Sequence, residues 1–165
     1  MKKPNSQKNI LSSQAALAFW TPSSKEEKAI NRRSHFERIT QVDEIWERLQ
    51  VELGDVVAVD SPHTFHPESF TYEELAENIS QAANAFFQIG LEPDDVVALF
   101  AENSPRWLIA DQGLMRLGAA DSVRGATAPV SELRYILEDS NAVGLIVQNS
   151  EVLERLSLNE KQINS

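Results

Sequence analysis

The pattern of apolar and polar residues predicts a chain in which helices alternate with short apolar strands. A first helix is expected behind Thr40, a candidate N-cap, and Gly54 is its natural stop. Residues 56–59 and 64–70 follow as two β-rich runs, which we expect to pair as an antiparallel hairpin. The apolar stripe of the first helix consists of Val42, Ile45, Trp46, Leu49 and Leu53.

A capping box predicts the start of the second helix. The Thr71 hydroxyl can accept the backbone N–H of Glu74, while the Glu74 carboxylate can accept the backbone N–H of Thr71. Gly90 is expected to end this helix, because glycine adopts the left-handed conformation without a Cβ clash. The predicted buried stripe consists of Leu75, Ile79, Ala82, Ala83 and Phe86.

A third helix follows the apolar run at residues 96–100, which is typical of an inner strand of a parallel sheet. Ser104 is its predicted N-cap, and Pro105 occupies the first helical position, where a missing N–H costs nothing. Gly118 is its expected stop. We expect its buried stripe to consist of Trp107, Ala110, Leu114 and Leu117.

The remaining elements complete an alternating pattern. Strands are predicted at residues 119–123 and 143–147, a helix at 129–140 and a helical turn at 152–158. Alternation of this kind implies right-handed crossovers, and hence an α/β fold with a mostly parallel, helix-covered sheet.

Charge is distributed unevenly along the 165 residues. The formal net charge is −10, but residues 1–38 carry eight Lys and Arg against three Glu, a net of +5, which leaves −15 for the rest. We therefore divide the chain into a basic, poorly ordered leader (1–38), a partial α/β domain (39–158) and a polar tail (159–165). The acidic body argues against nucleic acid as a partner. The leader could contact anionic lipid as a weak peripheral anchor, with a solvated tail as the alternative.

Cysteine is absent, and no apolar run approaches the length that spans a bilayer. The lack of cysteine excludes disulfides, thiolate zinc sites and a cysteine nucleophile, and it fits a reducing compartment. We expect a cytoplasmic protein.

Few residues suggest chemistry. His63 and His66 form the only histidine pair, in a loop that lacks further ligands, so we expect no metal site. The acid pairs at 73–74 and 94–95 are interpreted as a helix start and a turn, where negative charge complements the helix dipole. Without a glycine-rich phosphate loop, we assign no catalytic and no cofactor-binding residue.

The run at residues 122–125, Ser-Val-Arg-Gly, is the exception. It follows a predicted strand, at the carboxyl edge where open α/β sheets bind their ligands. Arg124 could pair with a phosphate or carboxylate there, beside Gly125. A surface arginine paired with a nearby acid is an equal alternative.

Residues 70–147 resemble the opening region of the AMP-forming acyl-activating enzymes, the adenylate-forming ligases that include the acyl-CoA synthetases. Within that family, the runs FAENSPRWLIADQG and VRG…SELRYILEDS are most similar to the long-chain acyl-acyl carrier protein synthetases of cyanobacteria and chloroplasts. The resemblance implies the first part of a large N-terminal domain. It also implies a ligase that adenylates a fatty acid with ATP and Mg²⁺ and transfers the acyl group to acyl carrier protein or coenzyme A.

The family's phosphate loop, ribose-binding Asp and catalytic Lys all belong beyond Val147, and the chain lacks them. ATP and Mg²⁺ are therefore implied for the full-length family enzyme, and we expect this chain alone to be inactive. By the resemblance, Arg124 and Gly125 belong to a loop near the pantetheine channel. Residues 96–100 and 143–147 should lack strand neighbours that further chain would supply. Two alternatives remain: an interaction module that pairs with a complementary chain or with acyl carrier protein, and a free-standing nucleotide binder.

Overall fold

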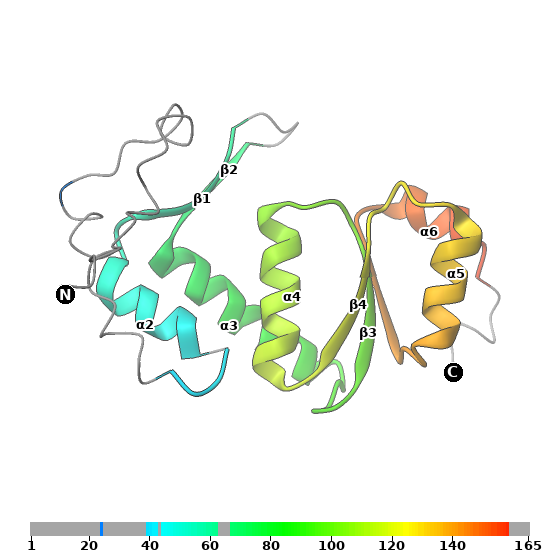
Figure 1. The fold of residues 1–165 in the computed structure, drawn as a ribbon, viewed down its shortest axis with the longest axis horizontal. Coiled ribbons are helices and arrows are strands. Elements are labelled where there is room, and N and C mark those ends of the chain that lie inside the picture. The colour runs from blue at the N-terminus through cyan, green and yellow to red at the C-terminus, as the bar shows by residue number, and fades with distance from the viewer. Residues whose placement is uncertain (1–23, 25–38, 43, 63–66, 159–165) are drawn as a thin grey trace, which may run out of the picture. The chain divides into compact units, whose positions relative to one another are not determined.

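The computed structural model describes residues 24, 39–42, 44–62 and 67–158, and the fold lies within residues 38–165. The predicted leader, apart from Ser24, and the predicted tail lie outside these residues, as do all three histidines. The elements, in chain order, are α2 (Glu44–Leu53), β1 (Val57–Ser61), β2 (Glu68–Thr71), α3 (Tyr72–Gln88), β3 (Val96–Phe100), α4 (Pro105–Leu117), β4 (Ala120–Arg124), α5 (Val130–Asp139), β5 (Gly144–Val147) and α6 (Ser150–Leu156) (Figure 1). This order confirms the predicted α/β class.

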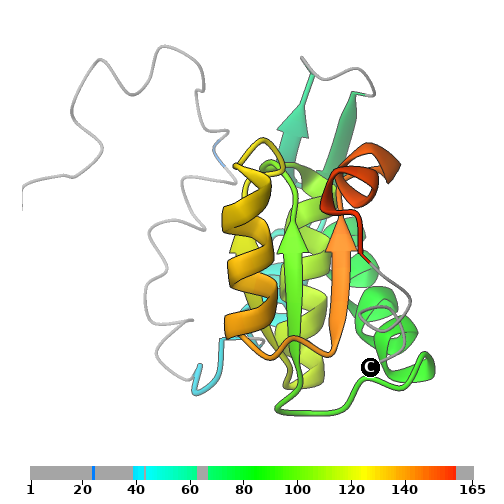
Figure 2. The same ribbon diagram turned by 90° about the vertical axis from the view of Figure 1, so that its right-hand side faces the viewer.

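The strands form two sheets. β1 and β2 pair antiparallel, as predicted, while β3 lies at the centre of a three-stranded parallel sheet with the order β4-β3-β5 (Figure 2). Phe100 at the end of β3 is in register with Arg124 of β4 and Val147 of β5. The expectation that residues 96–100 lack neighbours is therefore wrong, because β3 is paired on both sides. β5 pairs with β3 alone among the described strands.

The predicted caps of α3 are confirmed. The Glu74 N–H donates to Thr71 Oγ1 at 3.2 Å, and the Thr71 N–H donates to Glu74 Oε2 at 2.9 Å. Gly90 follows the helix with φ of 100°, a left-handed conformation that favours glycine. Leu75, Ile79 and Ala83 of the predicted stripe are buried.

The predicted caps of α4 are confirmed as well. The Trp107 N–H donates to Ser104 Oγ at 3.1 Å, Pro105 starts the helix, and Gly118 ends it with φ of 88°. Leu114 is the only residue of the predicted stripe that is fully buried, since Trp107, Ala110 and Leu117 are half-buried.

The first helix begins later than predicted. α2 starts at Glu44, and its carboxylate accepts the Thr40 N–H at 2.8 Å and the Thr40 hydroxyl at 3.1 Å. Thr40 therefore lies before the helix and donates hydrogen bonds to Glu44 in its first turn; it is not the N-cap. Val42, assigned to the apolar stripe, is 63% exposed because it precedes the helix. Ile45, Trp46 and Leu49 are half-buried.

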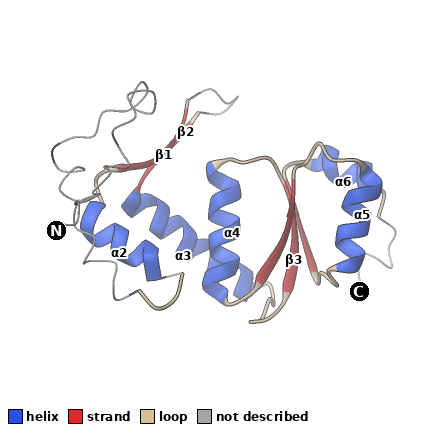
Figure 3. Ribbon diagram, in the orientation of Figure 1, coloured by secondary structure: helices blue, strands red, loops and turns tan. Residues whose placement is uncertain are grey.

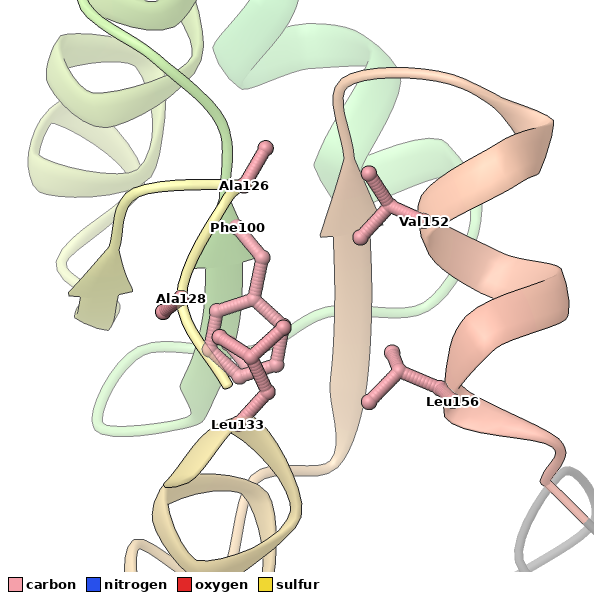
Figure 4. Packing of buried hydrophobic residues seen from close by; sticks show 7 residues of the cluster. Phe100, Ala126, Ala128, Leu133, Val152 and Leu156 are labelled. Carbon is pink, nitrogen blue, oxygen red and sulfur yellow. The ribbon is translucent and has the colours of Figure 1, made fainter. Parts of the chain in front are cut away.

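Helices cover both faces of the parallel sheet (Figure 3). On one face a buried cluster joins the sheet to α5 and α6 (Figure 4). On the other face Val97, Leu114 and Ala119 form a smaller cluster with α3 and α4. The first cluster consists of Ala98, Phe100, Ala126, Ala128, Leu133, Val152 and Leu156. Burying a leucine or phenylalanine side chain stabilises a fold by about 1.5–3 kcal/mol, so these two clusters hold the sheet between its helices.

Gly113 explains how closely α4 packs on α3. A Cβ atom at this position would lie 2.8 Å from the Ala82 Cβ and 3.2 Å from the Phe86 ring. The helix backbones can therefore approach only because residue 113 has no side chain.

No helix within the described residues is long and apolar enough to cross a membrane.

Candidate functional site

Arg124 and Gly125, the predicted substrate-channel residues, lie at the carboxyl edge of the parallel sheet. Arg124 is the last residue of β4, and Gly125 begins the loop toward α5. Because the three strands are parallel, the segments that follow them meet at the same edge. These segments are residues 101–104, 125–129 and 148–149. The structure thus places the two predicted residues where an open α/β sheet can hold a ligand.

Glu102 connects all three segments. Its backbone N–H donates to Gln148 Oε1 at 2.9 Å. Its carboxylate Oε1 accepts the Thr127 N–H at 3.2 Å and the Thr127 hydroxyl at 3.1 Å. A Cβ at Gly125 would lie 3.1 Å from the same carboxylate oxygen, so glycine lets the loop pass close to Glu102. We did not predict this role for Glu102, although an acid two residues after a buried strand was a usable signal.

Arg124 forms an ion pair with Glu132 of α5. Its Nε lies 2.7 Å from Glu132 Oε1, and the two side chains are 48% and 40% exposed. The hydrogen bond to Glu132, together with its charge, raises the pKa of the Arg124 guanidinium. Within the described residues, Arg124 donates only through Nε, so its other N–H groups are available at the sheet edge. In this structure Arg124 is the paired surface arginine of the alternative interpretation.

The loop that carries Gly125 is also held from α6. Arg155 donates through Nη1 to the Ala126 carbonyl at 2.7 Å and through Nη2 to the Ala128 carbonyl at 2.8 Å. The methyl groups of these two alanines are buried in the cluster of Figure 4. Glu102 and Arg155 therefore both fix this loop. A loop that is already fixed can position a bound group without rearranging when the group binds.

The chemical capacity of this edge is limited. α4, α5 and α6 all begin here, and Ser104 and Asn149 cap two of them. Helix N-termini and an arginine favour negatively charged groups. Among the described residues, no group of three or more His, Cys, Asp or Glu could hold a metal ion. The edge can therefore position an anionic or polar chain, but it has no paired nucleophile and base.

A pair of aspartates that the sequence did not reveal lies between α4 and β4. Asp121 is half-buried, and its Oδ2 is buried without a donor among the described residues. Burial raises the pKa of Asp121 to about 6, and the hydrogen bond and charge of Asp111 act in the same direction. Because both carboxylates are only acceptors when ionised, a proton on Asp121 would supply the donor for a hydrogen bond between them.

Gln112 connects the aspartate pair to α2. Its Nε2 donates to Asp111 Oδ2 at 2.6 Å, and its Oε1 accepts the Trp46 indole N–H at 2.7 Å. Asp121 could have been suspected from the strand pattern, since it lies two residues after the buried Ala119 and so faces the same side.

A separate groove of about 400 Å³ lies between β2, α3 and α4. At its mouth Arg106 forms an ion pair of 2.7 Å with Glu68. Its apolar lining consists of Phe70, Ala82, Phe86, Ile109 and Ala110. None of the predicted site residues lies in this groove.

Comparison with known proteins decides the family. Residues 46–164 match the family model described as AMP-binding enzyme. The chain belongs to this family. The match confirms the resemblance drawn from residues 70–147.

Two relatives of this AMP-binding family member come from Arabidopsis thaliana. The chain is 40% identical over 116 residues to "Probable acyl-activating enzyme 16, chloroplastic". It is 38% identical over 116 residues to "Long-chain-fatty-acid--[acyl-carrier-protein] ligase AEE15, chloroplastic". Each match covers 70% of this chain and 16% of the relative. The chain therefore spans only a small part of the length of these enzymes.

The fold of this family member is similar to that of a solved structure. The N-terminal domain of FACL13 from Mycobacterium tuberculosis matches with a TM-score of 0.66 at 19% identity. The match covers 74% of this chain and 31% of that one. At this identity the likeness concerns the fold alone. The described residues thus have the fold of part of the N-terminal domain of an adenylate-forming ligase.

Proposed function

We propose that this chain forms the N-terminal portion of an ATP-dependent, AMP-forming ligase that activates long-chain fatty acids and transfers them to acyl carrier protein or coenzyme A. The observation that carries the proposal is the 38% identity over 116 residues to an enzyme named as a long-chain fatty acid ligase acting on acyl carrier protein. Family membership supports the reaction type, and this relative supports the substrate class.

In a reaction of this class, a fatty acid carboxylate oxygen attacks the α-phosphorus of ATP, and the bond to pyrophosphate breaks. A thiolate then attacks the acyl carbon of the adenylate, and AMP leaves. The described residues do not fit either ATP or Mg²⁺, because they include no glycine-rich phosphate loop and no group of acids that could hold a metal. We therefore assign no adenylation step to them.

The contribution of this chain lies in the carboxyl edge of its sheet. Arg124 and Gly125 are proposed to line the channel that admits the pantetheine thiol arm. Support comes from the fixed position of the loop, which Glu102 and Arg155 hold through separate hydrogen bonds. The absence of a side chain at Gly125 would let the arm pass close to the backbone.

The test of this proposal is a chimera in which residues 46–164, which match the family model, replace the corresponding region of the Arabidopsis ligase AEE15. We expect the chimera to form palmitoyl-acyl carrier protein from palmitate, ATP and carrier protein. The chain alone should show no fatty-acid-dependent exchange of pyrophosphate into ATP. A folded chimera that activates other carboxylic acids but no fatty acid would contradict the proposed substrate class.

An Arg124→Ala variant of the chimera tests the channel. It should raise the KM for carrier protein and leave pyrophosphate exchange unchanged, because exchange does not require the thiol. Glu138→Ala, which removes an exposed charged side chain on α5, is the matched control. Equal loss of pyrophosphate exchange and of acyl transfer to carrier protein would contradict a role of Arg124 in the channel.

A further inference from the structure

Asp111 of α4 and Asp121 of β4 form a pair of carboxyl groups that the proposed function does not use. Asp121 Oδ2 is buried, and it has no hydrogen-bond donor among the described residues. A buried acceptor that lacks a donor destabilises the fold. A proton held between the two carboxyls would supply a donor, so the pair fits this fold best when it carries a single negative charge.

Within the part of the chain that the structure describes, no arginine bonds either aspartate. Each arginine of α4 and β4 pairs at 2.7 Å with an acid of another element, namely Arg106 with Glu68, Arg116 with Glu47 and Arg124 with Glu132. The acids of α3 and β1, which also contact α4, are exposed, and solvent screens their charge. These acids are Glu73, Glu74, Glu77 and Asp60. The charged residues of α2 are Glu44, Glu47, Arg48 and Glu52. Asp111 is the charged group that acts on Asp121.

Gln112 connects this pair to α2 through both ends of its amide. Its Nε2 donates to Asp111 Oδ2 at 2.6 Å and to Met115 Sδ at 3.6 Å, while its Oε1 accepts the Trp46 indole N–H at 2.7 Å. Because the amide nitrogen only donates and the oxygen only accepts, one orientation of the amide satisfies these partners. The position of the Asp111 carboxylate therefore sets whether Trp46 finds an acceptor.

α2 is attached mainly by partly exposed contacts. It packs on α3, but none of its residues is fully buried. Besides the bond from Trp46 to Gln112, Arg116 of α4 forms an ion pair with Glu47, whose side chain is 66% exposed. Gln112 and Arg116 are four residues apart, so one stripe of α4 makes both contacts. An element with so few buried contacts can open without unfolding the rest of the fold.

We propose that the Asp111–Asp121 pair is a pH-sensitive switch that controls the docking of α2 on α4. The pair holds α2 in place while it shares a proton, and α2 is released more often once both carboxyls are ionised. Gln112 is the side chain that passes this change from β4 and α4 to α2.

The direction of the switch follows from the charge on the pair. Burial, and secondly Asp111, raise the pKa of Asp121 from 3.8 to about 6. The shared proton is therefore retained below about pH 6 and lost as pH rises above it. Two carboxylates then lie side by side, and Asp111, which is only half-buried, moves toward water and removes the acceptor of Gln112. The inference rests on contacts within this chain and not on the proposed acyl substrate.

The chain contains no cysteine, so a single introduced thiol reports on the opening of α2. Leu49→Cys replaces a half-buried side chain of α2, and Val51→Cys replaces one that is 79% exposed on the same helix. The ratio of their labelling rates with an activated disulfide gives the opening constant of α2 and cancels the pH dependence of the thiolate. Histidine ordinarily titrates at about pH 6.5, so the parent chain carries His35→Gln, His63→Gln and His66→Gln.

We expect the opening constant to rise about fivefold between about pH 4.5 and pH 7.5, because a half-buried group keeps only part of the effect that its full pKa shift allows. Asp121→Asn should abolish the rise and keep the constant at its low-pH value. Asp111→Asn, whose amide oxygen still accepts from Gln112, should reduce the rise. An opening constant that is independent of pH in the parent, or the same rise in both asparagine variants, would overturn the proposal. So would equal opening constants at Leu49→Cys and at Leu137→Cys of α5, because α2 would then open only with the whole fold.

Gln112→Ala tests the connection between the aspartate pair and α2. The opening constant should then be high at both pH values, while carbon NMR of the Asp121 carboxyl still shows a pKa of about 6. Glu47→Gln is the matched control, because it removes the ion pair between α2 and α4 and should leave the pH dependence in place. A pH-dependent constant in Gln112→Ala, or loss of the pH dependence in Glu47→Gln, would assign the switch to other groups and overturn the proposal. None of these measurements uses activity, so the proposed fatty acid chemistry and the switch can fail independently.

Discussion

Asp121→Asn tests the electrostatic account of the aspartate pair. The pKa of Asp121 rises from 3.8 to about 6 in the fold, because of burial first and Asp111 second. The folded state therefore binds more protons than the unfolded state between about pH 4 and pH 6, and stability must fall as pH rises through this range. Asparagine carries no charge, and its amide can donate to Asp111. The substitution therefore removes the cause of this loss of stability at higher pH.

The magnitude follows from the size of the shift. A shift from 3.8 to about 6 corresponds at most to about 3 kcal/mol, at 1.36 kcal/mol for each pKa unit. Asp121 is only half-buried, and solvent screening reduces such an interaction, so we expect roughly 1 kcal/mol. Asp121→Asn should therefore raise the free energy of unfolding by roughly 1 kcal/mol at about pH 7 and change it little at about pH 4.

Urea denaturation at both pH values measures the effect, with Asp60→Asn as the matched control. Asp60 lies on β1 with an exposed side chain, so its substitution should change the free energy of unfolding by less than about 0.5 kcal/mol. If Asp121→Asn lowered the free energy of unfolding equally at both pH values, the carboxyl would act through a specific hydrogen bond instead of an unfavourable charge, and the reasoning would be refuted.

Substitutions at three further positions test contacts that hold the fold and the sheet edge. Thr71→Ala removes the hydroxyl that accepts the Glu74 N–H and should lower the free energy of unfolding by about 1 kcal/mol in urea denaturation. Gly113→Ala brings a methyl group within 2.8 Å of the Ala82 Cβ and should cost about 1–3 kcal/mol in the same assay, so an unchanged value would show that α3 and α4 can separate freely. Glu102→Ala removes the acceptor of the Thr127 N–H, while Arg155 still holds Ala126 and Ala128, and it should speed hydrogen exchange of the Thr127 amide by about tenfold; Glu102→Gln, whose amide oxygen can still accept, should have a smaller effect.

The elements that the sequence predicted correctly are those fixed by neighbouring residues. The exchange between Thr71 and Glu74 spans three positions, and Ser104 caps a backbone N–H three residues ahead. Glycine after a helix depends only on its own φ angle. The prediction that Thr40 is an N-cap was wrong because other local hydrogen bonds compete. The Thr40 N–H and hydroxyl both donate to the carboxylate of Glu44, the first residue of the helix.

The contacts that define the site could not be predicted in this way. Glu102 meets Thr127 across 25 positions, because strand register brings the ends of β3 and β4 together. Trp46 meets Gln112 across 66 positions, where α2 and α4 come together. The strand order β4-β3-β5 likewise follows from crossovers and not from any local signal. Residue types at a sheet edge could be anticipated, but their partners depend on the register.

Arg124 can be both a surface arginine paired with an acid and a residue that pairs with a ligand, because its partner can be exchanged. Its bond to Glu132 is exposed on both sides, and salt screens such pairs strongly. An incoming anionic group could replace the Glu132 carboxylate without a backbone change, because Glu102 and Arg155 hold the following loop independently of that bond. A surface ion pair is therefore compatible with a channel role. Substitution of Glu102 or Arg155 would cost more than substitution of Glu132, because their contacts determine where the loop lies.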